Sequence, residues 1–158
     1  MTKTGLKISG IAASVAAILT AAAGVIATFE GLRTKPYRDP VGVMTVCYGE
    51  TSGEMRTYTP DECAQLLRER IARDYAPAVF QCVPSLMRAP DASVAAISFA
   101  YNVGVGAFCK STMANKMRIG DIRGGCDEFK RWVYAGGRQL PGLVKRREVE
   151  ADLCYRDA

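Results

Sequence analysis

The chain opens with an apolar run and continues in shorter segments where polar and apolar residues alternate. Lys3 and Lys7 precede an uncharged run from Ile8 to Phe29. As a helix its roughly 22 residues would be about 33 Å long, enough to cross a hydrocarbon core of ~30 Å. Ala, Gly, Ser and Thr dominate the run, so the sequence predicts a weak membrane anchor over residues 1–29.

Two other interpretations of this run stay open. The small residues Thr20-Ala21-Ala22-Ala23-Gly24 resemble a cleavage site, which would make the segment a conventional signal peptide. The apolar run nevertheless continues past them, beyond the ~7–15 residues typical of a signal peptide. Small residues such as Gly10, Ala13 and Ala17 would also suit a helix packed against other helices in a protein core.

From Tyr37 to Tyr58 the alternation shortens to the period of a strand. Strand formers are interspersed with turn residues: Val41, Val43, Val46 and Tyr48 among Pro40, Gly42, Gly49 and Gly53. This pattern predicts a small antiparallel hairpin sheet.

The rest of the chain has the spacing of amphipathic helices. Thr59-Pro60-Asp61-Glu62 forms a capping box with proline at the first helical position, and predicts a helix to about Tyr75. Further helices are expected over Asp91–Asn102, Ser111–Arg118, Ile122–Tyr134 and Pro141–Cys154, separated by glycines. The predicted fold class is α+β and mainly helical, with one core.

Composition narrows the chemistry. The formal charge is +5 and the pI is about 9.0, which favours anionic partners such as the acidic bacterial cell wall. The basic residues alternate with Asp and Glu instead of forming a block, so nucleic acid is not expected as a partner. The chain has no histidine, so acid–base chemistry must rest on carboxylates. We expect no metal and no cofactor.

Six cysteines form an even, well-separated set without a C-x-x-C pair: Cys47, Cys63, Cys82, Cys109, Cys126 and Cys154. Disulfides are the natural interpretation in an exported protein, and buried free thiols are the alternative in a cytosolic one. Several connectivities are possible. Pairing of sequence neighbours in order is the simplest hypothesis.

Two carboxyl residues stand in contrasting surroundings. Glu30 ends the apolar run between Phe29 and Gly31, where we expect it to retain its proton, whereas Asp39 in a polar turn should be ionised. Glycoside hydrolysis needs such a division between an acid and an ionised partner. Thr45, on the returning strand, would face Asp39 and hold a water through its hydroxyl.

The segment FEGLRTKPYRDPVGVMTVCYGET resembles the active-site hairpin of phage-type lysozymes, whose catalytic Glu, Asp and Thr fall at Glu30, Asp39 and Thr45. The resemblance continues nearly to the end of the chain, through SFAYNVG, STMANKMRIGD, Lys130-Arg131-Trp132-Val133 and GLVKRREVE. It implies a small sheet-bearing lobe and a helical lobe flanking a sugar-binding cleft.

The resemblance also implies roles for individual residues. Glu30 would be the general acid of an inverting glycosidase, with Asp39 and Thr45 positioning the attacking water. Asn102 would reach the glycan, and Arg146 or Arg147 would pair with an active-site carboxylate. The catalytic domain would comprise residues 30–158.

The N-terminus is similar to that of signal-arrest-release endolysins. These lysozymes of tailed phages are exported through the host Sec system, held inactive in the inner membrane and then released into the periplasm to cut peptidoglycan. We expect a monomer. The competing hypotheses are a secreted lysozyme with a cleaved signal peptide and a non-catalytic wall-binding domain that keeps the fold.

Overall fold

The computed structural model describes the backbone of residues 4–158 and the side chains of residues 15–158. The α-helices of this part of the chain are α1 (Thr4–Glu30), α2 (Pro60–Arg70), α3 (Ala76–Cys82), α4 (Pro90–Val103), α5 (Val105–Lys110), α6 (Thr112–Arg118), α7 (Ile122–Asp127) and α8 (Pro141–Tyr155). A π-helical segment, η1 (Ile71–Tyr75), and two 3-10 segments, η2 (Pro84–Arg88) and η3 (Glu128–Arg131), lie between them. Strands β1 (Arg33–Arg38) and β2 (Met44–Cys47) form one antiparallel hairpin, and β3 (Tyr134–Ala135) and β4 (Arg138–Gln139) another.

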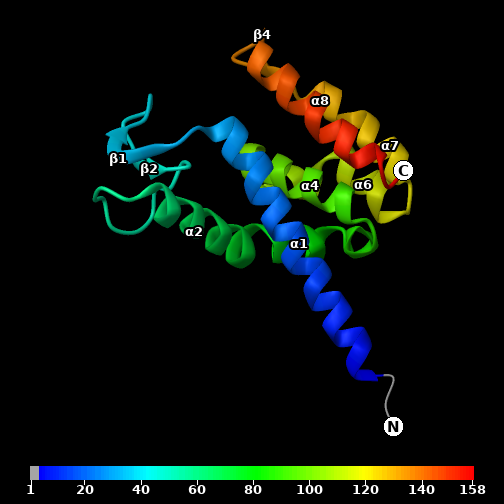
Figure 1. Cartoon of the computed structure of the whole chain (residues 1–158). Coiled ribbons are helices and arrows are strands. Elements are labelled where there is room, and N and C mark those ends of the chain that lie inside the picture. Colours follow the sequence, from blue (N-terminus) through cyan, green and yellow to red (C-terminus); the bar gives the residue numbers. More distant parts are fainter. Residues whose placement is uncertain (1–3) are drawn as a thin grey trace.

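The expected α+β, mainly helical fold is confirmed. Figure 1 shows the β1–β2 hairpin at one end of the molecule and helices α4, α6, α7 and α8 gathered away from it, with α2 running between. We call residues 33–59 the sheet lobe and residues 76–158 the helical lobe.

The sheet lobe differs in register from the sequence prediction. β1 begins at Arg33 instead of Tyr37, and Tyr37 pairs with Thr45 across the hairpin. Val41 was predicted to lie in a strand, but it sits in the turn and is 83% exposed. The turn forms here because the Asp39 carboxylate accepts the backbone N–H groups of Val41 and Val43 and so stabilises the loop more than a strand would.

The helix after the sheet lobe begins as predicted and ends later. Thr59 accepts from the Glu62 backbone while the Glu62 side chain accepts from the Thr59 backbone, which confirms the capping box. Helical structure continues through η1 and α3 to Cys82, beyond the predicted end at Tyr75. Pro77 does not stop it, because it stands in the first turn of α3, where a proline is tolerated.

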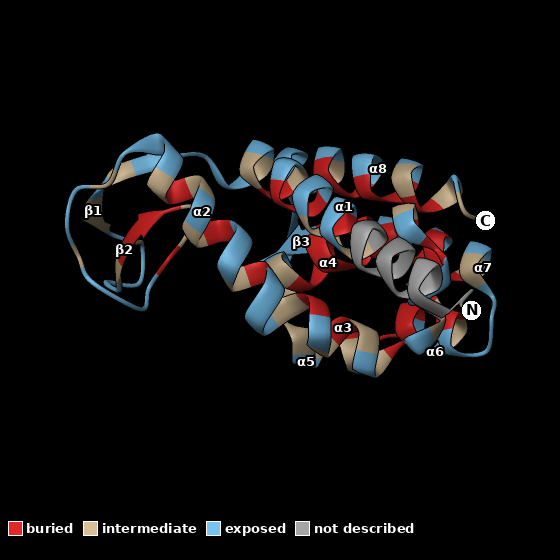
Figure 2. Ribbon diagram, turned by 60° about the horizontal axis from the view of Figure 1, so that its bottom comes forward, coloured by how far each residue is buried: buried red, intermediate tan, exposed pale blue. Residues whose placement is uncertain are grey.

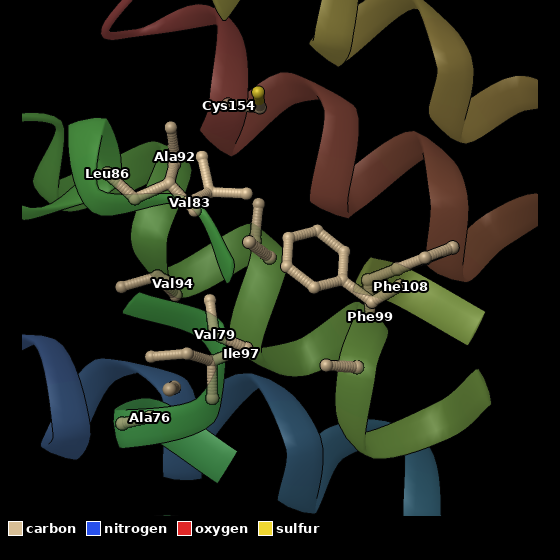
Figure 3. Close-up of a cluster of buried hydrophobic side chains, with 14 of the residues drawn as sticks. Ala76, Val79, Val83, Leu86, Ala92, Val94, Ile97, Phe99, Phe108 and Cys154 are labelled. Atoms are coloured by element: carbon tan, nitrogen blue, oxygen red, sulfur yellow. The ribbon is translucent and has the colours of Figure 1, made fainter. Parts of the chain in front are cut away.

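The core is built around α4. Every residue from Ala92 to Ala100 is buried, and Figure 2 shows this helix enclosed by its neighbours. α1 contributes Ile18, Ala22, Ala23 and Ile26 to the same core cluster, and α8 contributes Ala151 and Cys154. In Figure 3, Phe99 and Ile97 project from α4 among side chains of η2, α3 and α5.

The predicted anchor is therefore partly visible as a packed helix. Its backbone belongs to α1 from Thr4 onward, and from Val15 onward one face of the helix is buried against the protein. Side chains of residues 1–14, which complete the predicted anchor, lie outside the described residues. Among the residues that the structure does describe, no helix combines the length and apolar character needed to span a membrane.

Disulfide pairing in sequence order is confirmed. Cys47 is bonded to Cys63, Cys82 to Cys109 and Cys126 to Cys154, with Cα–Cα distances of 5.1, 5.6 and 5.6 Å. The first bond attaches β2 to α2, the second joins α3 to α5, and the third joins α7 to α8.

The helix predicted over Ile122–Tyr134 is the main error in the helical lobe. α7 ends at Asp127, a 3-10 segment follows to Arg131, and Tyr134 starts the β3–β4 hairpin. Gly136 and Gly137 form its turn with φ of +57° and +75°, a conformation that glycine adopts without strain. The remaining predicted helices are present, with ends within a residue of those expected.

Candidate active site

Glu30 is the last residue of α1. Gly31, with φ of +72°, ends the helix there. The Glu30 side chain is 25% exposed, and its Oε1 accepts a hydrogen bond from Arg146 Nη1 at 2.7 Å. The same guanidinium lies over the Phe29 ring, 5.3 Å from its centroid. A positive charge therefore adjoins the carboxyl that the sequence placed in apolar surroundings.

A cavity of about 550 Å³ opens beside this ion pair. Its lining comes from the end of α1, the end of α4 and the start of α8: Thr28, Phe29, Glu30, Asn102, Leu140, Gly142, Leu143, Lys145 and Arg146. Glu30, Asn102 and Arg146, which the sequence assigned to one site, thus share one cavity. Asp39 and Thr45 lie on the hairpin and are not among its lining residues.

Asp39 and Thr45 are joined through Val43. The Val43 carbonyl accepts from the Asp39 backbone N–H at 2.9 Å and from the Thr45 hydroxyl at 3.1 Å. The Val43 N–H in turn donates to Asp39 Oδ1 at 2.8 Å. By strand register Asp39 and Thr45 are diagonal neighbours, so their side chains leave the same face of the hairpin. Thr45 is buried and Asp39 is half-buried.

The two arginines of α8 have different partners. Arg146 pairs with Glu30, whereas Arg147 Nη2 donates to Asn102 Oδ1 and Arg147 Nε to the Trp132 carbonyl, the latter at 3.0 Å. Burial lowers the pKa of the Arg147 guanidinium, against the opposing effect of a neighbouring carboxylate, Glu150. Arginine still remains charged at neutral pH.

Sequence reasoning missed Glu150 as part of this site. Its carboxylate is fully buried and forms ion pairs with both arginines. The only signal in the sequence is its spacing, three residues after Arg147 and four after Arg146, which on a helix brings the side chains together. Charged residues at this spacing usually lie on a solvent-exposed helix face, so the spacing did not mark Glu150 as a residue of the site.

Within the described residues, no group of three His, Cys, Asp or Glu side chains is placed to hold a metal ion. What the site offers chemically is a carboxyl in a cavity, a guanidinium beside it and a second carboxyl on the hairpin.

Comparison with known proteins decides the family. The phage lysozyme family matches residues 27–150, a stretch that includes every site residue discussed above. The chain belongs to the phage lysozyme family. This confirms the resemblance seen in the sequence.

Sequence similarity between this phage lysozyme and its relatives extends over almost the whole chain. It is 45% identical to the SAR-endolysin of Bacteriophage PS119, over 93% of this chain and 89% of the relative. It is 40% identical to the SAR-endolysin of Enterobacteria phage P21, over 93% and 90% respectively.

Solved structures share the fold. The muramidase domain of SpmX from Asticaccaulis excentricus is 26% identical, with a TM-score of 0.73 over 84% of this chain and 93% of that one. The active form of the P1 phage endolysin Lyz is 24% identical, with a TM-score of 0.76 over 92% and 93%.

Proposed function

We propose that this phage lysozyme is an endolysin that hydrolyses the β-1,4 bond between N-acetylmuramic acid and N-acetylglucosamine in peptidoglycan and thereby lyses the host cell. The observation that carries the proposal is the Glu30 carboxyl, which lines a cavity at the end of α1 and is held by Arg146. Membership of the phage lysozyme family and the SAR-endolysin relatives support it.

Glu30 is the general acid in this proposal. It donates a proton to the leaving glycosidic oxygen, and its carboxylate then remains beside the Arg146 guanidinium, which stabilises that charge. Asn102, on the same cavity, supplies an amide group for the sugar.

Asp39 and Thr45 position the attacking water. The Asp39 carboxylate accepts one proton of the water as it attacks. The water's other hydrogen stays on its oxygen and donates a hydrogen bond to the Thr45 hydroxyl oxygen, which is available as an acceptor because the Thr45 hydroxyl hydrogen is already donated to the Val43 carbonyl.

We further propose inversion at the anomeric carbon. Inverting enzymes keep their carboxyls about 6.5–9.5 Å apart to admit a water, against about 5–5.5 Å in retaining enzymes. The position of Asp39 on the hairpin, outside the residues that line the cavity beside Glu30, supports the wider spacing. Proton NMR of the first product should show the α-anomer at the new reducing end, and an initial β-anomer would refute inversion.

The decisive test of the activity replaces Glu30 by Gln, which keeps the side chain's shape and removes its acid. Lysis of purified cell walls should fall by a factor of about 10²–10⁴, the usual contribution of a positioned acid. Glu148→Gln, an exposed glutamate on α8, is the matched control and should keep wild-type activity. Undiminished lysis by folded Glu30→Gln would reject the glycosidase assignment.

The N-terminal segment, residues 1–29, serves in this proposal as a releasable anchor inserted through the host Sec system, and residues 30–158 as the catalytic domain. The SAR-endolysin relatives support tethering at the inner membrane followed by release into the periplasm. The burial of Ile18, Ala22 and Ile26 supports a released, monomeric form in which the former anchor packs on the domain.

Cell fractionation with intact mass measurement tests this topology. The full-length chain is expected first in the inner membrane and later in the periplasm. A periplasmic chain shortened by about 20–30 residues would instead indicate a cleaved signal peptide.

A further inference from the structure

Glu150 is a fully buried carboxylate on α8 that does not line the cavity. Its Oε1 accepts from Arg146 Nε at 3.1 Å and from the Ser98 hydroxyl at 2.7 Å, and its Oε2 accepts from Arg147 Nη1 at 2.6 Å. A buried charge is costly unless it is paired and hydrogen-bonded, and here both oxygens are satisfied.

Each arginine uses one nitrogen for Glu150 and another for a residue of the cavity. Arg146 donates Nη1 to Glu30, at the end of α1, while Arg147 donates Nη2 to Asn102, near the end of α4. One buried carboxylate is therefore linked, through two rigid guanidinium groups, to cavity residues on two different helices.

We propose that Glu150 is a positioning residue of the glycosidase site, which orients Arg146 against Glu30 and Arg147 against Asn102. The proposal rests on the function proposed above. Glu150 touches no substrate in this arrangement and acts through the arginines.

Charge balance supports a role beyond packing. When Glu30 is ionised, Glu30 and Glu150 together match the charges of Arg146 and Arg147; when Glu30 is protonated, Glu150 is the carboxylate that remains for both arginines. Without the Glu150 charge, Arg146 would have Glu30 as its remaining carboxylate partner, and the ionised form of the general acid would be favoured. The active, protonated enzyme would then persist only at lower pH.

The other groups facing Glu30 do not provide this balance. Lys145 of α8 lines the same cavity and adds positive charge. Tyr101 of α4 also lies within electrostatic range, and burial raises the pKa of its hydroxyl, so it is neutral over the working range. Ser98 and Asn102 of α4 and the Trp132 carbonyl, directly after η3, contact the arginines and carry no charge.

The test compares Glu150→Gln and Glu150→Asp with wild type and with the exposed control Glu148→Gln. Rates of wall hydrolysis are measured against pH and divided by the folded fraction. Glu150→Gln removes the charge but keeps the shape, so kcat should fall about tenfold and the alkaline limb of the rate profile should move about one pH unit toward acid. Glu150→Asp restores the charge, so the limb should return to its wild-type position while kcat stays intermediate.

A merely structural role predicts a different result: less folded protein, with the wild-type profile in the molecules that fold. Wild-type kcat and an unmoved alkaline limb in folded Glu150→Gln would overturn the proposal. Should that variant not fold, wild-type kcat in Glu150→Asp overturns it, since the shorter side chain does not reach both arginines equally.

This outcome is separable from the main proposal. If Glu30→Gln is inactive and the Glu150 variants behave as wild type, only the positioning role fails. If Glu30→Gln retains full activity, the glycosidase assignment fails regardless of Glu150.

Discussion

The two carboxyls assigned to catalysis are held in opposite ways. Asp39 is held by its own turn, through backbone N–H groups two and four residues away. Glu30 is held by Arg146, which is 116 residues distant in sequence. The hairpin carboxyl is therefore positioned by local structure, whereas the helix-end carboxyl depends on the folding of the whole helical lobe.

This difference determines whether catalytic activity can be changed without changing the stability of the fold. In the sheet lobe a change of charge at Asp39 leaves the turn's hydrogen bonds available, because an amide oxygen accepts as a carboxylate does. Glu30 is paired with a cluster of three buried charged residues, Arg146, Arg147 and Glu150, where removing one partner leaves another uncompensated. Function and folding are thus independent in one half of the site and coupled in the other.

The largest expected effect is on activity, for Asp39→Asn. We expect wall hydrolysis to fall by a factor of about 10²–10⁴, since the amide accepts no proton from the attacking water. The free energy of unfolding should change by less than about 0.5 kcal/mol, because Asn keeps the acceptor for Val41 and Val43. Lysis assays and urea unfolding measure the two quantities, and a loss of more than 2 kcal/mol would erase the contrast between the lobes.

Glu50 tests the comparison from the other direction, because this residue of the sheet lobe forms an ion pair with Arg70 of α2 and is itself buried. Its Oε1 accepts from Arg70 at 3.0 Å and from the Ser52 hydroxyl at 2.6 Å. Burial alone would raise the pKa of Glu50, but these hydrogen bonds and the Arg70 charge outweigh it and lower the pKa. The folded protein therefore favours the ionised carboxylate.

The sign of the pH effect follows from this lowered pKa. The stabilisation by Glu50 is complete above the pKa of an unfolded glutamate, about 4.3, and is lost as the pH falls through the folded value. Glu50→Gln should lower the free energy of unfolding by about 1.5–3 kcal/mol at pH 7, with most of the difference gone near pH 3. Denaturant unfolding across this range measures it. Glu54→Gln, at an exposed residue, is the control. A Glu50→Gln protein that loses as much free energy of unfolding near pH 3 as at pH 7 would contradict the prediction.

The sequence predicts best where structure is local. The capping box at Thr59, the turn glycines and the helix over Pro141–Cys154 depend on neighbours within a few residues, and each is present. Errors arise where one local signal outweighs another or where a helix end carries no clear stop signal. Val41 has the propensity of a strand, yet the Asp39 side chain two residues earlier turns the chain there. The helix was expected to end at Tyr75, but Pro77 stands in the first turn of α3 and the helical structure continues.

The same distinction applies to the site. Glu30 and Asp39 stand in a recognisable motif, so their positions followed from the resemblance. The assignment of Arg146 to Glu30 and Arg147 to Asn102 needed the structure, because adjacent arginines point to different helices. Glu150 was missed because three- and four-residue spacing on a helix looks the same whether that face is solvated or buried.

The smallest expected effect concerns the junction of the two lobes. The Tyr101 hydroxyl, on α4, donates to the Tyr48 carbonyl in the sheet lobe at 2.6 Å. Tyr101→Phe removes this bond and leaves the carbonyl without that donor, which should cost about 1 kcal/mol and lower Tm by roughly 2–4 °C. Tyr134→Phe loses a hydroxyl on a residue that is 63% exposed and should leave Tm unchanged. If Tyr101→Phe melts at the same temperature as wild type, this hydrogen bond contributes nothing measurable to the junction of the two lobes.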